Sequence, residues 1–284
     1  MNNVKSNVID KPIRVKAAGF EGWVSMAGAK ASSIAGDWRA VGLAIEEIAG
    51  CREAGQIVYK DDARSEVREV CVADKKWIVK QVKMGGVKGF VYGLLRMSPP
   101  WREWRGCLRL ALTGCDVIGP LGLVRVCGGV GCGAGRLVFP AAEGGCLYHW
   151  MMSHPRSLEN RKAREAIAYR MGEQVGLMTS DGVINRDFKP SNWVLRYDRY
   201  RRNLLPVMID LVGLRKGYSE QKIFRMLGAF GQASQGAGGV TMRECLCFMK
   251  GFTSKDVRFL NKQRRRAVSI LRGAVCFYKL HFED

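Results

Sequence analysis

The segment INRDFKPSNWVL runs from Ile184 to Leu195 and places three polar side chains before an apolar run: Asp187, Lys189 and Asn192. The run continues as WVLRY, and after the basic stretch DRYRRN a second apolar segment follows, LPVMIDLVG, which contains Asp210. Two apolar segments joined by a polar turn predict a β-hairpin. Because a hairpin returns on itself, we expect the polar residues at its entrance to lie close to Asp210 at its exit.

These side chains suit phosphate chemistry. A carboxylate and an amide oxygen near one point match the preference of Mg²⁺ for oxygen ligands, with phosphate and water in the remaining positions. A nearby lysine would offset the charge of a phosphoryl group during its transfer. The hairpin therefore predicts a site for a divalent cation and a phosphate.

The segment resembles the catalytic loop of protein kinases, H-R-D-x-K-x-x-N, and MIDLVG resembles the metal-binding D-F-G segment that follows it. This resemblance implies ATP and Mg²⁺ as cofactors and a role for each residue. Asp187 would orient or deprotonate the attacking hydroxyl, and Lys189 would contact the γ-phosphate. Asn192 and Asp210 would hold Mg²⁺.

A kinase-like site also needs an ATP-positioning lysine on a strand and a glutamate on the next helix. The segments QIVYK, EVREVCVA and WIVKQVK predict three antiparallel strands, since Asp- and Lys-rich turns separate them. In the third strand, alternation places Lys80 between Ile78 and Val82 on one face, so Lys80 is the first candidate and Lys83 the second. The helix predicted for WREWRGCLRLALTG contains one acidic residue, Glu103, which is the expected partner.

Along the rest of the chain the pattern changes from strands to helices. LGLVRV and GRLVFPA predict two more strands around a glycine-rich turn, whereas CLYHWMM, SLENRKAREAIAYRMGEQVGLM and IFRMLGAFGQASQG predict helices. The expected fold class is α+β: a bilobal protein-kinase-like fold with a small antiparallel-sheet N-lobe and a shortened, mainly helical C-lobe. The expected domains are an N-terminal extension over residues 1–50 that packs on the N-lobe, the N-lobe over 51–142, and the C-lobe with the catalytic loop over 143–284.

Some features depart from the protein-kinase pattern. Asn185 replaces the usual histidine before Arg-Asp, and the pair Leu211–Val212 replaces the usual Phe. A glycine-rich phosphate loop is missing, and the corresponding turn is KDDARS, whose backbone amides or Arg64 would have to cover the phosphates of ATP. Only 74 of the 284 residues follow Asp210 and no A-P-E triplet appears, so a full protein-kinase C-lobe does not fit.

This shortened arrangement resembles the lipopolysaccharide kinase (Kdo/WaaP) family, kinase-like bacterial enzymes that phosphorylate sugars of the lipopolysaccharide core. The likeness rests on WIVKQVKMGG, on REWRGCLRLALTGCDVIGPLGLV and on MIDLVGLRK, within residues 55 to 270. The segment DFKPSN, however, is closer to the catalytic-loop sequence of protein kinases than to that of this family.

The composition indicates which partners and which cellular compartment suit the protein. With 46 Lys and Arg against 26 Asp and Glu, the net charge is +20, and the surface would attract anions. Ten cysteines without a C-x-x-C pair fit a reducing compartment, and three scattered histidines argue against a histidine metal site. We see neither a signal peptide nor a transmembrane helix in the sequence. We expect a cytoplasmic protein, with peripheral contact to the anionic inner face of the cytoplasmic membrane as an alternative.

The preferred function is ATP- and Mg²⁺-dependent transfer of phosphate to a hydroxyl of a sugar or glycolipid, with a lipopolysaccharide-core sugar implied by the family resemblance. Excess Lys and Arg would attract such an anionic acceptor. A serine/threonine protein kinase is one alternative, and a pseudokinase or nucleic-acid-binding module that uses the runs at 196–202 and 264–266 is another. Nucleic acid is the least favoured partner because aromatic residues do not regularly interleave these runs, although Tyr197 and Tyr200 leave it open.

The phosphotransferase hypothesis depends on one expected arrangement. Lys80, Glu103, Asp187 and Asp210 lie far apart in the chain and would have to converge in a groove between the N-lobe sheet and the helical C-lobe. A Lys80 beyond the reach of Glu103 would contradict the hypothesis.

Overall fold

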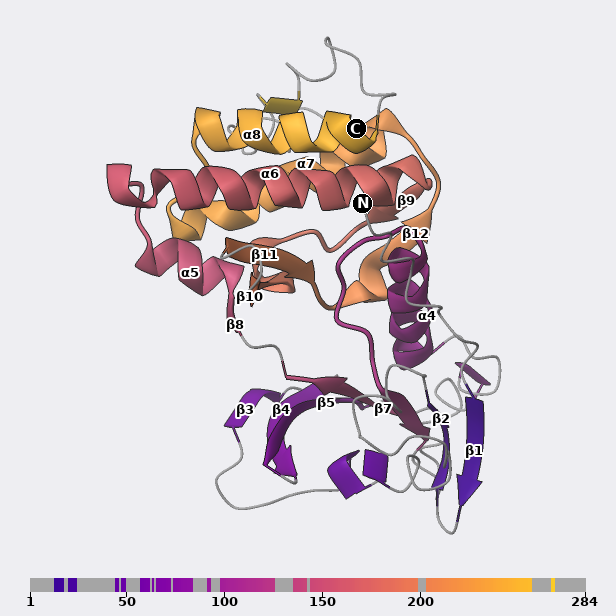
Figure 1. The fold of residues 1–284 in the computed structure, drawn as a ribbon. Coiled ribbons are helices and arrows are strands. Elements are labelled where there is room, and N and C mark those ends of the chain that lie inside the picture. The colour runs from indigo at the N-terminus through magenta and orange to yellow at the C-terminus, as the bar shows by residue number, and fades with distance from the viewer. Residues whose placement is uncertain are drawn as a thin grey trace, which may run out of the picture. The chain divides into compact units, whose positions relative to one another are not determined.

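The computed structural model has the α+β architecture that the sequence predicts. The chain divides into two compact units, an N-terminal unit of residues 1–112 and 118–141 and a C-terminal unit of residues 113–117 and 142–284 (Figure 1). The predicted domain boundaries after residues 50 and 142 stay predictions. The structure describes residues 13–17, 20–24, 44–45, 47–49, 57–61, 63, 65–72, 74–83, 91–92, 98–125, 135–141, 144–198, 203–256 and 267–268.

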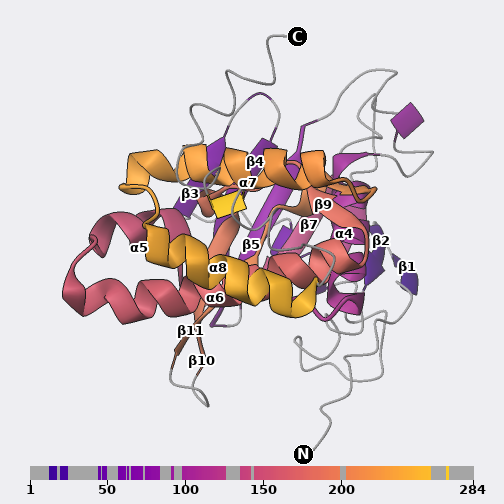
Figure 2. The ribbon, with the colours of Figure 1, turned by 90° about the horizontal axis from the view of Figure 1, so that it is seen from above.

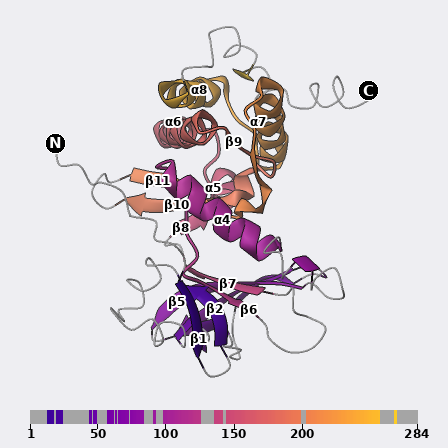
Figure 3. The same cartoon turned by 90° about the vertical axis from the view of Figure 1, so that its right-hand side faces the viewer.

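The N-terminal unit is built on an antiparallel sheet whose seven described strands follow the order β1-β2-β6-β7-β5-β4-β3 (Figure 3). The strands are β1 (Ile13–Ala17), β2 (Phe20–Val24), β3 (Ile57–Asp61), β4 (Ser65–Val72), β5 (Lys75–Val82), β6 (Gly122–Arg125) and β7 (Gly135–Pro140). The five strands predicted from QIVYK to GRLVFPA are confirmed as β3 to β7. The stretch GFEGWV, which is compatible with a strand or an irregular segment, forms β2 and pairs with β6.

Helix α4 (Pro99–Leu112) packs on one face of this sheet (Figure 3). Its N-terminal prolines are tolerated because the first turn of a helix has no internal partner for a backbone N–H. Trp101 and Trp104 of α4 share one buried core cluster with Leu123 of β6 and Leu137 of β7. Removing a buried tryptophan side chain costs about 3–5 kcal/mol, so this cluster strongly favours one orientation of α4 on the sheet.

The opposite face of the sheet carries a buried polar network that the sequence did not reveal. Arg68 of β4 is only 2% exposed and donates hydrogen bonds to the Ala49 carbonyl at 2.7 Å and to Glu66 Oε1 at 2.7 Å. Arg136 of β7 donates to the same Ala49 carbonyl at 3.1 Å. Ala49 belongs to the described helical residues 47–49. The two arginines therefore fasten this helical segment to the sheet.

The C-terminal unit is mainly helical, with two small sheets. One sheet has the strand order β11-β10-β8, and the other pairs β12 with β9. The helices are α5 (Leu147–Ser153), α6 (Leu158–Ser180), α7 (Glu220–Ser234) and α8 (Met242–Lys255), with 3-10 turns η1 (Pro190–Asn192), η2 (Leu211–Gly213) and η3 (Gln235–Ala237). The strands are β8 (Gly144–Cys146), β9 (Val183–Asn185), β10 (Trp193–Asp198), β11 (Asn203–Met208) and β12 (Leu214–Lys216).

Helices α6 and α8 run side by side in Figures 1 and 2 and touch through glycines. A Cβ atom on Gly172 of α6 would lie 2.0 Å from the Phe248 carbonyl oxygen, and one on Gly251 of α8 would lie 2.0 Å from the Tyr169 carbonyl oxygen. Both distances are far below van der Waals contact. These glycines therefore permit the backbones of the two helices to approach, which a larger residue at either position would prevent.

Candidate active site

The loop between β9 and β10 contains three of the predicted site residues in mutual contact. Asn192 Nδ2 donates hydrogen bonds to the Asp187 carbonyl oxygen at 2.8 Å and to Asp187 Oδ2 at 3.1 Å. Lys189 Nζ lies 3.0 Å from Asp187 Oδ1. Each carboxylate oxygen of Asp187 thus has a donor beside it, while the side chains of Asp187 and Lys189 stay 46% and 40% exposed. An exposed, oriented carboxylate can accept a proton from a ligand.

Local sequence explains this loop. Phe188 is 1% exposed and packs edge-on against Trp193, with ring centroids 5.8 Å apart, and against Phe230 of α7 at 5.0 Å. Pro190 opens the turn η1, in which the Asn192 amide donates to the Lys189 carbonyl at 3.0 Å. Burial of Phe188 therefore anchors the loop between the two exposed polar residues that flank it.

Asp210 follows β11 at the exit of the hairpin, as predicted. Trp193 of β10 pairs with Met208 of β11, and the Ile209 amide donates to the Asn192 carbonyl at 2.9 Å. The residue before Asp210 is therefore bonded to Asn192. Asp210 itself has φ 56° and ψ 63°, the left-handed region, which costs a non-glycine residue roughly 1–2 kcal/mol. Strained residues of this kind concentrate at functional sites.

In the N-terminal unit, Lys80 of β5 reaches Glu103 of α4. Lys80 Nζ lies 2.8 Å from Glu103 Oε2 and 3.1 Å from Oε1. The Glu103 side chain is 2% exposed and that of Lys80 is 14% exposed. A carboxylate buried to this degree requires a compensating charge, which Lys80 supplies. Lys83, the second candidate, forms an ion pair with Asp61 in which both side chains are at least 36% exposed. The geometry thus agrees with Lys80 rather than Lys83 as the partner of Glu103.

Arg64, the predicted phosphate-covering residue, lies outside the described residues. The neighbouring strands β3 and β4 pair in antiparallel register from Ile57–Glu69 to Asp61–Glu66, with an irregularity between Val58 and Lys60. The turn that would cover phosphates therefore joins two antiparallel strands, and the role of Arg64 stays a prediction.

Sequence reasoning missed a support for the strand that leads to Asp210. The Asp116 carbonyl accepts a hydrogen bond from the Met208 amide at 3.2 Å. Gln174 of α6 holds Asp116 twice, accepting from its backbone N–H at 2.6 Å and donating to Oδ2 at 2.9 Å. Beside it, burial raises the pKa of the Cys115 thiol to about 12, so this thiol is no nucleophile at neutral pH. No local signal could reveal these contacts, because the partners lie far apart in the sequence.

The donor set at the hairpin fits Mg²⁺. The Asn192 side chain donates its hydrogen bonds to Asp187 from Nδ2, so its amide oxygen can serve as a metal ligand alongside the Asp210 carboxylate. Mg²⁺ is usually bound by one or two protein ligands together with substrate phosphates and water. The described part of the chain contains no group of three or more His, Cys, Asp and Glu side chains that could hold a metal alone. Asn192 and Asp210 therefore suit a metal ion that also binds substrate phosphates better than a structural metal held by protein ligands alone.

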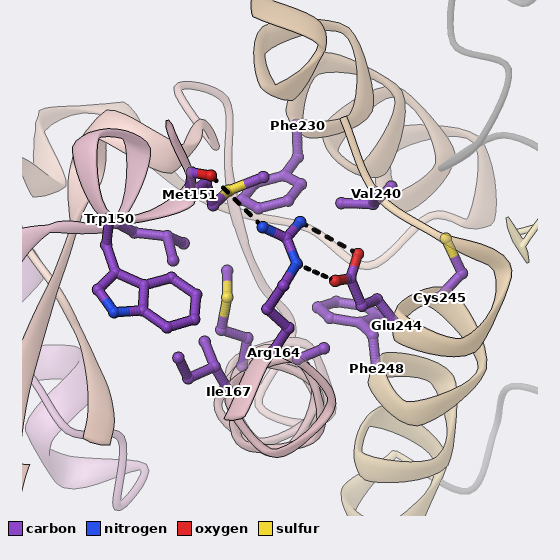
Figure 4. A pocket seen from close by; sticks show the side chains of 12 residues that line it. Trp150, Met151, Arg164, Ile167, Phe230, Val240, Glu244, Cys245 and Phe248 are labelled. Atoms are coloured by element: carbon purple, nitrogen blue, oxygen red, sulfur yellow. Dashed lines mark hydrogen bonds and ion pairs between the residues drawn. The ribbon is translucent and has the colours of Figure 1, made fainter. Parts of the chain in front are cut away.

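A separate apolar pocket in the C-terminal unit contains none of the predicted site residues (Figure 4). Its polar members are Arg164 of α6 and Glu244 of α8, which form a buried ion pair. Arg164 also donates to the carbonyls of His154 at 2.9 Å and Gly239 at 3.3 Å. Glu244 completes a capping box with Thr241 at the start of α8. Since Arg164 is surrounded by acceptors from the protein itself, the pair is a structural element.

No helix among the described residues has the length and apolar character needed to cross a membrane.

Comparisons with known proteins bear on the fold. No family model matches this chain, and no curated protein matches its sequence. Among solved structures, "WaaP in complex with acyl carrier protein" matches with a TM-score of 0.60 and 16% sequence identity, covering 83% of this chain and 92% of that one. At this identity the likeness concerns the fold alone. This chain therefore has a protein-kinase-like fold related to that of WaaP.

Proposed function

We propose that this protein is an ATP- and Mg²⁺-dependent phosphotransferase that acts on a hydroxyl group. The observation that carries the proposal is the loop network, in which Lys189 and Asn192 hold the two carboxylate oxygens of Asp187. The kinase-like fold and the Lys80–Glu103 ion pair support it. Phosphoryl transfer depends mainly on positioning and charge neutralisation, which these side chains can provide.

Each residue would have a defined task. Asp187 would accept the proton of the acceptor hydroxyl as its oxygen bonds to the γ-phosphorus and the bond to the ADP oxygen breaks. Lys189 would neutralise charge on the transferred group, and Lys80, oriented by Glu103, would bind phosphates of ATP. Asn192 and Asp210 would hold Mg²⁺, which when bound neutralises charge on the β- and γ-phosphates.

We propose a sugar or glycolipid as the acceptor, with a lipopolysaccharide-core sugar as the first choice. The fold related to WaaP and the net charge of +20 support this choice, because a positive surface raises the encounter rate with anionic acceptors. Such steering weakens as salt screens it. The catalytic efficiency with an anionic acceptor should therefore fall between 50 and 300 mM NaCl by several-fold, and with a neutral sugar much less.

Mg·ATP binding is the first test. Ligand at about 100 times its Kd stabilises a protein by roughly 2.7 kcal/mol, which would appear as an increase in the melting temperature. We expect this increase for the natural protein and its loss in Asp210→Ala. Asp74→Ala is a matched control, because Asp74 in the β4–β5 turn is the other described non-glycine residue with positive φ, at 57°. If Mg·ATP does not raise the melting temperature of the natural protein, the proposal is contradicted.

The acceptor is tested by transfer of labelled γ-phosphate to separate pools of core sugars, glycolipids and peptides. We expect label in a sugar-containing pool. Label only in peptides would reject the glycolipid choice and favour a protein kinase. Steep salt-dependent binding to generic DNA without transfer or hydrolysis would favour a nucleic-acid-binding module instead.

A further inference from the structure

Asn185, the last residue of β9, makes a contact that neither the kinase resemblance nor the sequence pattern assigns. Its side chain is 2% exposed, and its Oδ1 accepts a hydrogen bond from the Asp187 backbone N–H at 3.0 Å. Its own backbone N–H lies 3.4 Å from the Met226 sulfur of α7. The bond therefore forms inside the protein, where water cannot replace it.

Gly213 shapes the space around this bond from the other side. The Arg186 amide donates to the Gly213 carbonyl at 3.1 Å, and the next residue, Leu214, pairs with Asn185. A Cβ atom on Gly213 would lie 2.6 Å from Asn185 Oδ1 and 2.9 Å from the Asp187 amide nitrogen. The backbone of Gly213 thus rests directly on the Asn185–Asp187 hydrogen bond. Since Gly213 lies three residues after Asp210, this contact joins the two predicted catalytic segments.

The backbone of Asp187 is held at both ends. Asn185 binds its N–H, and Asn192 binds its carbonyl oxygen. With only one of these bonds, the peptide groups on either side of Asp187 could rotate and carry the carboxylate with them. Displacement of a catalytic group by about 1 Å can cost roughly 100-fold in rate.

We propose that Asn185 is a positioning residue, whose side-chain oxygen fixes the backbone of Asp187 against the Gly213 end of the metal-binding segment. The inference rests on the proposed phosphotransferase function. It predicts that substitutions of Asn185 change kcat but not the affinity for ATP, since Asn185 is buried and cannot contact ATP directly.

The test compares three substitutions by acceptor-independent hydrolysis of Mg·ATP. Asn185→Leu keeps the approximate shape but removes the acceptor, whereas Asn185→Asp keeps an acceptor oxygen. Asn160→Leu is the control, because Asn160 at the start of α6 also makes one side-chain hydrogen bond to the backbone, in this case by donating from Nδ2 to the Pro155 carbonyl at 3.1 Å. Rates are measured per folded molecule, with the folded fraction taken from thermal melts.

We expect Asn185→Leu to lower kcat by about 10- to 100-fold with KM for ATP changed less than about threefold. Asn185→Asp should recover most of that loss, and Asn160→Leu should behave as the natural protein. Gly213→Ala provides an independent approach, since its methyl group would press on the same bond while Asn185 stays in place. It should lower kcat similarly, and the double variant with Asn185→Leu should be no slower than the slower single variant.

The positioning role would be overturned if Asn185→Leu had the same kcat as the natural protein, or if Asn185→Leu and Asn185→Asp lowered kcat equally. Either result would leave the phosphotransferase proposal intact. A natural protein that neither binds nor hydrolyses Mg·ATP would overturn the phosphotransferase proposal itself. The two failures are therefore distinguishable. If Asn185→Leu does not fold, Asn185→Asp and Gly213→Ala still decide the question through their kcat values.

Discussion

The two groups of predicted site residues are held together in different ways. In the predicted catalytic loop, Asp187 contacts Asn192, five residues away, and its side chain stays half exposed. In the N-terminal unit, Lys80 contacts Glu103, 23 residues away, and Glu103 is almost fully buried. The loop depends on local geometry and the ion pair on the packing of a helix against a sheet. Changes in the loop should therefore alter chemistry alone, while changes in the ion pair should alter chemistry and stability together.

The largest effect is expected at the loop. Asp187→Asn should lower the rate of phosphate transfer by about 10²- to 10⁴-fold, the usual contribution of a general base. The free energy of unfolding should change by about 1 kcal/mol or less, because the contacts of the Asp187 carboxylate with Lys189 and Asn192 are half exposed. Transfer kinetics and urea denaturation measure the two quantities. A large loss of stability in this variant would contradict the view that the loop is energetically independent of the fold.

The ion pair should show both effects. Lys80→Met should lower the rate of phosphate transfer by about 10²- to 10³-fold, the usual effect of losing a charge-stabilising group. It should also destabilise the fold by about 3–5 kcal/mol, because Glu103 would stay buried without its cation. Lys83→Met is the control on the same sheet, because its exposed pair with Asp61 should contribute at most about 1 kcal/mol. Equal effects of the two substitutions would remove the distinction between Lys80 and Lys83.

A buried pair outside the proposed site should affect stability only. Arg164→Met would leave Glu244 buried and unpaired and should destabilise the protein by about 3–5 kcal/mol, with transfer per folded molecule unchanged. Adding Glu244→Gln should restore part of the loss, because it removes the uncompensated charge. Arg161→Met, which breaks a partly exposed pair with Glu165 on the same helix, should cost about 0.3–0.5 kcal/mol. Urea denaturation of the four proteins measures these differences.

The smallest expected effect is a titration. The hydrogen bond from the Tyr59 hydroxyl to Glu69 at 2.7 Å raises the pKa of Tyr59 to about 12. Because the folded-state pKa lies above the usual value of 10, the stabilisation from this bond is fully present below pH 10 and is lost as the pH rises through 12. Ultraviolet titration of the natural protein should show a tyrosine component that ionises near pH 12, and Tyr59→Phe should remove that component. In Glu69→Gln the same tyrosine should ionise nearer pH 10; a late tyrosine that persists there would have another cause.

Local patterns made much of this architecture predictable. The β10–β11 hairpin, α4, α6 and the strands β3 to β5 follow from alternation, helical spacing and turn residues, and the structure confirms them. The contact between Lys80 and Glu103 could be predicted for two reasons. Lys80 shares a strand face with apolar residues, and Glu103 is the one acidic residue of the helix that follows. In contrast, the bonds of Gln174 to Asp116 carry no local signal, since the partners lie far apart in the sequence. The bond of Asn185 to Asp187 spans two residues, as in an Asx turn, but its burial against Gly213 follows from packing.

By itself, the sequence determined which chemical groups are present and in which order: a strand lysine, a helix glutamate, a loop aspartate with its lysine and asparagine, and an aspartate at the end of a hairpin. These are consequences of residue type and spacing over fewer than about ten positions. Only the tertiary structure decided which of two lysines meets Glu103, why Gly172 and Gly251 are glycines, and that Asn185 lies beneath Asp187. The physical reason is burial, which makes a hydrogen bond or ion pair specific by removing water as the competing partner, and burial depends on residues distant in the chain.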